Sequence, residues 1–150
     1  MIKILTVMAV LLLLVPLLPL YPQFAAEMER ALDLPQVTYS QAARFVLAAS
    51  QTLPENTSVA QAFVYARDQK IMPGNVADVP ITLGALSLLM MKSFNIKGGF
   101  MYALFPSKRY AYRAMVRREL IQGFADPGLT VSGERFFYIL SRVLSYVGDE

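Results

Sequence analysis

Apolar residues recur at helical spacing in five stretches of the chain, and segments rich in polar residues, proline and glycine separate these stretches. Spacings of three and four residues place the apolar side chains of each stretch on one face of an α-helix. The five helices cover roughly residues 38–49, 58–71, 83–94, 107–121 and 133–146. The pattern therefore predicts an all-α domain of about five helices in helix–loop–helix repeats.

Local signals support the boundaries of these helices. Thr38 and Ser58 are each followed three residues later by a glutamine, which is the capping-box pattern of a helix start. Residues 83–94 are apolar nearly all round, which is typical of a central buried helix, and they are too few to span a bilayer, which needs about 20 apolar residues. Residues 100–105 predict only a short helical turn.

The N-terminal segment has the pattern of an export signal. Lys3 precedes an almost unbroken apolar run over residues 4–20, and Ala25-Ala26 offers small residues for cleavage just beyond it. We therefore expect residues 1–26 to be a signal peptide, with a retained N-terminal membrane anchor as the alternative. Residues 27–34 are interpreted as a connector that Pro35 ends, and residues 27–150 as a single domain.

A pattern in the loops indicates an internal repeat. Three hydrophobic-threonine pairs, Val37-Thr38, Ile81-Thr82 and Leu129-Thr130, each precede an apolar helix. The same segments precede the second and third pairs in the same order. They are a helix, an aliphatic pair (Ile71-Met72 or Leu120-Ile121), a turn glycine and a loop containing aspartate. A period in the mid-forties is typical of small helical units that bury one another's apolar faces.

The order of helix, aliphatic pair, turn glycine, aspartate loop, threonine and helix resembles the S-layer homology (SLH) module, whose repeats hold bacterial envelope proteins to cell-wall polymer. The best-matching copy spans residues 112–144 and includes the segment LIQGFADPGLT. Residues 62–94 form a weaker copy, and residues 36–50 match the closing helix alone. The resemblance implies a scaffold of helical repeats.

SLH modules usually continue from the threonine with an arginine and an acidic residue. Here Thr38 is followed by Tyr-Ser-Gln, Thr82 by Leu-Gly-Ala, and Thr130 by Val-Ser-Gly. The residues that would carry binding to wall polysaccharide are therefore replaced, and no binding residue is transferred from the family.

Composition narrows the possible chemistry. The chain has no cysteine and no histidine, which excludes disulfides, thiol nucleophiles, zinc sites of the usual kind and imidazole catalysis. No nucleophile–base pair or paired carboxylates can be assembled, so we expect no enzyme, no catalytic residues, no metal and no cofactor. The net charge of +3 is far below that of a dedicated nucleic-acid binder.

A basic stretch is the strongest polar feature. Arg109, Arg113 and Arg117 are four residues apart, so they form one stripe on a helix, with Lys108 and Arg118 beside them. Guanidinium groups suit bidentate capture of carboxylate or phosphate. We predict that these five residues bind an anionic partner. The alternative is a solvated face whose arginines pair with Asp126, Glu134 or Asp68.

These features together favour an exported, non-catalytic binding or structural module, periplasmic or associated with the cell envelope. Its partner would be an envelope polymer, a lipid headgroup or an envelope protein, and no nucleic acid. The alternative is a membrane-anchored accessory protein that retains residues 4–20 and offers its domain to a protein partner.

Overall fold

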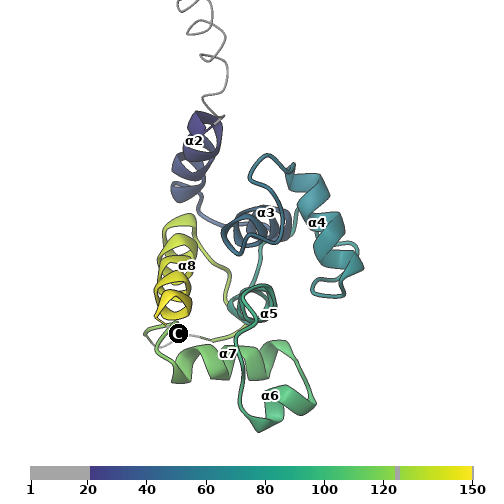
Figure 1. Ribbon diagram of the computed structural model, residues 1–150, viewed down its shortest axis with the longest axis vertical. Coiled ribbons are helices and arrows are strands. Elements are labelled where there is room, and N and C mark those ends of the chain that lie inside the picture. The colour runs from purple at the N-terminus through teal and green to yellow at the C-terminus, as the bar shows by residue number, and fades with distance from the viewer. Residues whose placement is uncertain (1–20, 124–125, 150) are drawn as a thin grey trace, which may run out of the picture.

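The computed structural model describes residues 21–123 and 126–149, which form seven α-helices and no β-strand (Figure 1). Residues 1–20, the larger part of the predicted signal or anchor, lie outside the described residues. The all-α prediction is confirmed. The helices are α2 (Tyr21–Leu32), α3 (Tyr39–Ala49), α4 (Val59–Asp68), α5 (Leu83–Ser93), α6 (Phe100–Leu104), α7 (Lys108–Arg117) and α8 (Gly133–Gly148).

The prediction of about five helices is wrong in number because it misses α2 and α6 as elements. Residues 27–32, interpreted as part of a connector, are the second half of α2. Phe24, Met28 and Ala31 lie on the core side of this helix at helical spacing, but the first of them falls within the segment assigned to export. Residues 100–104, predicted as a turn, form the one-turn helix α6.

The predicted helix starts are confirmed. The side chains of Thr38 and Ser58 accept hydrogen bonds from the backbone of Gln41 and Gln61, and the glutamine side chains accept from the backbone of the capping residues. These reciprocal bonds satisfy amides that the first helical turn leaves without a partner. Thr82 and Ser107 cap α5 and α7 in the simpler way, through the side chain alone.

The helices form three helix–loop–helix pairs, α2–α3, α4–α5 and α7–α8, which close into a ring (Figure 1). The second helix of each pair packs against the first helix of the next: α3 against α4, α5 against α7, and α8 against α2. Each pair thus covers an apolar face that its neighbour exposes. The short helix α6 lies outside this arrangement and contacts α7.

Backbone hydrogen bonds tie the three loops together at the centre of the ring. The amide of Val37 donates to the carbonyl of Val131, and the amide of Ile81 donates to the carbonyl of Val37, both at 2.8 Å. All three residues are buried. The first amides of α3, α5 and α8 likewise donate to a loop of another pair, in the bonds Tyr39 to Val79, Leu83 to Leu129 and Gly133 to Leu34.

These contacts correct the predicted third pair, Leu129-Thr130. The residue that caps α8 is Ser132, and the buried residue before it is Val131, so Val131-Ser132 corresponds to Val37-Thr38 and Ile81-Thr82. Leu129 is 49% exposed. The predicted pair lies two residues before the observed one, because the repeat was defined by threonine and the residue that caps α8 is a serine.

Helix α5 is the central helix, as predicted. Every residue from 83 to 91 is buried, and the helix packs against both α3 and α7. In the described part of the chain, no helix is long and apolar enough to cross a membrane.

A buried arginine joins α2 to α3. Arg44 is 5% exposed; one guanidinium nitrogen lies 3.2 Å from a carboxylate oxygen of Glu27 and also donates to the carbonyl of Glu55. The guanidinium group lies 4.9 Å from the centre of the Phe24 ring. Phe24 in turn packs against Phe45, with 5.9 Å between ring centres. A buried charge is tolerated only with such partners, so Arg44 fixes the position of α2.

Candidate functional site

Helix α7 carries the basic stretch, and its sequence divides it into two faces. Ala111, Ala114 and Met115 are buried toward α5, and the arginines at the remaining positions are directed away from the core. Ser107 begins the helix by accepting a hydrogen bond from the amide of Tyr110 at 3.4 Å. The small alanines let the helix lie close to α5, which holds the basic face rigidly at the surface.

Three of the five predicted residues form the exposed stripe. Arg109, Arg113 and Arg117 are exposed on α7, and none of them has a carboxylate within 4.0 Å among the described residues. Asp68 pairs instead with Arg67 at 2.9 Å, and the Asp126 side chain accepts from the amide of Gly128 at 2.6 Å. The positive charges of the stripe are therefore not neutralised by those neighbours.

The other two predicted residues are held by intramolecular contacts. The Lys108 amine lies 5.8 Å from the centre of the Tyr39 ring and donates to its hydroxyl at 3.4 Å. Arg118 donates to the Tyr146 hydroxyl at 3.2 Å and to the carbonyls of Ala114 and Lys97. These contacts connect α7 to α3, to α8 and to the segment before α6, so both residues also contribute to the packing of the fold.

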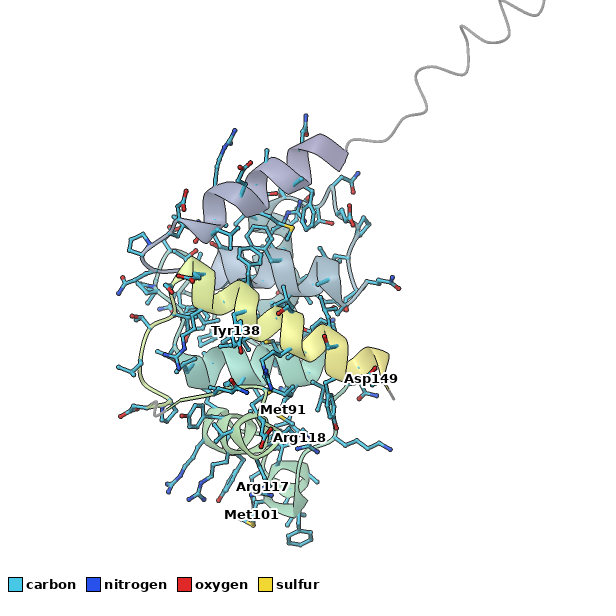
Figure 2. The ribbon with its side chains drawn as sticks, turned by 90° about the vertical axis from the view of Figure 1, so that its left-hand side faces the viewer. Met91, Met101, Arg117, Arg118, Tyr138 and Asp149 are labelled. Carbon is cyan, nitrogen blue, oxygen red and sulfur yellow. The ribbon has the colours of Figure 1, made fainter. Side chains whose placement is uncertain are left out.

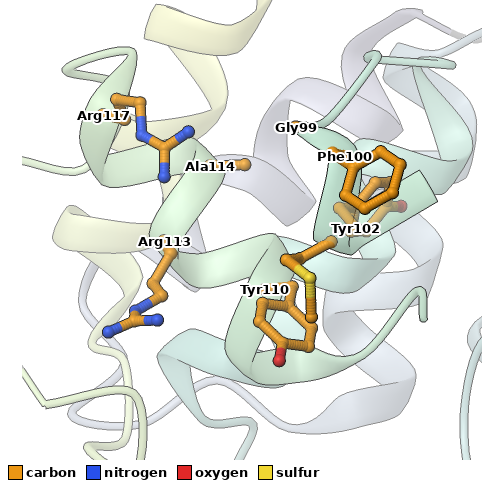
Figure 3. A pocket seen from close by; sticks show the side chains of 8 residues that line it. Gly99, Phe100, Tyr102, Tyr110, Arg113, Ala114 and Arg117 are labelled. Atoms are coloured by element: carbon orange, nitrogen blue, oxygen red, sulfur yellow. The ribbon is translucent and has the colours of Figure 1, made fainter. Parts of the chain in front are cut away.

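A cleft of about 250 Å³ lies between α6 and α7 (Figure 3). Tyr102 and Phe100 lie on its α6 side, and Arg113 and Arg117 extend from α7. Gly98 shapes the α6 side, because a Cβ atom at this position would lie 2.3 Å from a ring carbon of Tyr102. The cleft combines aromatic and cationic groups.

Tyr102 is a neutral group in this cleft. Burial raises the pKa of its phenol, because desolvation disfavours the phenolate. The hydroxyl therefore keeps its proton at physiological pH. It suits hydrogen bonding to a polar ligand rather than proton abstraction.

The sequence did not indicate that the apolar residues of α6 are exposed. No residue of this helix is buried, and Phe100, Leu104 and Phe105 are 77%, 54% and 62% exposed. Met101 is exposed as well, and Figure 2 shows it at the end of the molecule opposite α2. The available signal was a glycine-bounded run, FMYALF, without a charged residue of its own beside a strongly basic stretch.

The described residues contain no group of three or more acidic, histidine or cysteine side chains that could hold a metal ion. In comparisons with known proteins, no family model, curated protein sequence or solved structure matches this chain.

Proposed function

We propose that this chain is a non-catalytic module of the cell envelope that binds an anionic envelope component through Arg109, Arg113 and Arg117. The observation that carries the proposal is the exposed stripe of three guanidinium groups without a carboxylate partner among the described residues. Like charges at this spacing on a helix repel one another. Binding of an anionic partner relieves that repulsion and uses the five donors of each guanidinium group.

The length of the stripe favours an extended partner. Four residues rise about 6 Å along an α-helix, so the three arginines span about 12 Å. A single small anion would contact one or two of them. A surface or polymer with repeated negative groups contacts all three at once, and this multivalency raises the affinity without requiring a deep pocket.

The scaffold supports a binding role of this kind. The ring of three helix–loop–helix pairs is consistent with the proposed SLH-like arrangement, in which the units stabilise one another. The apolar run over residues 4–20 is the basis for proposing export across the inner membrane, with either a cleaved signal or a retained anchor.

The experiment is retention of the natively produced chain in the envelope fraction of its host. The test variant carries Arg109→Gln, Arg113→Gln and Arg117→Gln. The matched control carries Arg30→Gln, Arg67→Gln and Lys70→Gln, which removes the same charge from exposed positions on α2 and α4 or just after α4. We expect the test variant to be released and the control to be retained. Equal retention of the two variants, each recovered as the cleaved chain without residues 1–26, contradicts the proposal.

A further inference from the structure

The α6 tip, defined here as Phe100, Met101, Leu104 and Phe105, is the largest run of exposed apolar side chains in the described residues. These four residues come from one short stretch, and their side chains are 43% to 77% exposed. Apolar surface in water is unfavourable in proportion to its area. An exposed cluster rimmed by polar residues commonly marks a surface that contacts a membrane or another molecule.

Basic residues lie beside this tip, on its α7 side and in the segment before it. From residue 97 to residue 118 the chain contains six basic residues and no acidic residue. Lys97 precedes the tip, and Arg113 and Arg117 line the cleft that separates α6 from α7. A partner of the tip therefore has to accept apolar side chains and to carry negative charge beside them.

We infer that the α6 tip inserts into the outer part of an anionic phospholipid bilayer while the α7 stripe binds the lipid headgroups. The inference rests on the proposed function and names its ligand. A wall polymer supplies anions but no apolar phase for Phe100, Leu104 and Phe105. A bilayer interface supplies both within a few ångströms, and aromatic side chains such as those of Tyr102 and Tyr110 are favoured at that depth.

The placement of the tip allows this contact. Figures 1 and 2, which are related by a 90° turn, both show α6 at one end of the molecule, with α2 at the other end. The tip can therefore reach a flat surface ahead of the other helices. Because no α6 residue is buried, the tip can enter a bilayer without disturbing the core around α5.

The absence of tryptophan from the sequence permits a direct test. The substitution Phe100→Trp places a single fluorescent reporter on the tip. The substitution Val64→Trp places a matched reporter at an exposed apolar position on α4, which lies away from α6 (Figure 1). Each full-length variant is diluted from detergent into vesicles of phosphatidylcholine alone or of phosphatidylcholine mixed with phosphatidylglycerol. Any attachment of the chain to vesicles through residues 1–20 would occur in every sample. A difference in emission between the two reporters therefore cannot come from that attachment alone.

We expect the tryptophan emission of the Phe100→Trp variant to shift to the blue, and brominated lipid to quench it, only on vesicles that contain phosphatidylglycerol. The emission of the Val64→Trp variant should change on neither kind of vesicle. In the Phe100→Trp background, changing Arg109, Arg113 and Arg117 to glutamine should raise the lipid concentration needed for half of the shift at least tenfold. Changing Leu104 and Phe105 to glutamine should reduce quenching while leaving the helical circular dichroism unchanged.

An emission of the Phe100→Trp variant that stays the same on both kinds of vesicle overturns the inference. If the stripe variant nevertheless loses its envelope retention, the proposed function stands, and the anionic partner is a polymer or a protein. A shift of equal size on neutral vesicles also overturns the inference, because it removes the role of the headgroup charge. Loss of both the shift and the retention difference contradicts the proposed function itself.

Discussion

Ile81 and Val37 are joined by a 2.8 Å hydrogen bond from the amide of Ile81 to the carbonyl of Val37. Both residues are buried, and each immediately precedes the residue that caps a helix. A buried amide needs a partner, and these loops supply one another's partners. The connection explains how short helices that are each marginal alone form a stable domain without a disulfide bond.

The closure of the ring depends on Gly133. A Cβ atom at this position would lie 1.8 Å from the carbonyl oxygen of Ala31 at the end of α2. We predict that Gly133→Ala lowers the free energy of unfolding by about 3 kcal/mol, since the backbone of α2 has to move. Urea denaturation measures this loss. Gly148→Ala, where a Cβ meets no atom within 4 Å, is the control and should have little effect. Similar midpoints for the two variants would refute this role.

The register of the third loop is tested by its two hydroxyl residues. Ser132→Ala removes the cap of α8, whose side chain accepts from the amide of Arg135 at 3.3 Å, and should cost about 1 kcal/mol. Thr130→Ala removes one exposed bond from Gln36 and should cost less than about 0.5 kcal/mol. Thermal unfolding of both variants distinguishes them. A larger loss of stability for the Thr130 variant than for the Ser132 variant would instead support Leu129-Thr130 as the third pair.

Arg44 is expected to contribute more to stability than any exposed arginine. Arg44→Ala removes a buried guanidinium group, its bond to Glu27 and its contact with Phe24, and should cost about 2–4 kcal/mol. Arg67→Ala removes an exposed ion pair with Asp68 and should cost less than about 0.5 kcal/mol. Chemical denaturation of the two variants provides the comparison. Equal costs would mean that Arg44 does not fix α2.

The arginines of the basic stretch should separate into structural and binding residues. Arg118→Gln loses charged hydrogen bonds to Tyr146 and to two carbonyl groups, so it should destabilise the fold by about 1–2 kcal/mol. Arg113→Gln should leave stability unchanged and weaken binding to envelope material. Paired measurements of unfolding and of binding test this division. It fails if Arg113→Gln destabilises the fold as much as Arg118→Gln does.

Helix positions could be predicted from the sequence where periodicity and capping residues agree. Thr38 with Gln41 and Ser58 with Gln61 gave correct helix starts because capping is a local interaction. Helix α2 was missed because its first residues fall within the segment assigned to export and its last residues were interpreted as a connector. The cap at Ser132 was missed because the pattern was read for threonine alone, and the backbone bond from Val37 to Val131 that fixes the register is a tertiary contact.

The candidate site could be predicted only in part for a similar reason. The spacing of Arg109, Arg113 and Arg117 is a local property, and it placed them on one stripe. The partners that hold Lys108 and Arg118 come from Tyr39 and Tyr146, far away in the sequence. The exposure of the apolar residues of α6 likewise depends on how the helix pairs pack, and the pattern of residues 100–105 predicted only a helical turn.

Binding of an anionic envelope component by the stripe of α7 should depend strongly on salt, because the attraction between charges is screened by ions. Full-length chain is bound to isolated envelope material while the salt concentration rises from about 0.1 M to about 1 M, which shortens the screening length from about 10 Å to about 3 Å. We predict a steep loss of affinity for the wild-type chain as the salt concentration rises. The variant with Arg109, Arg113 and Arg117 changed to glutamine should bind at least tenfold more weakly at low salt and show a shallower dependence. Identical affinity and salt dependence of the two chains would contradict binding by the stripe.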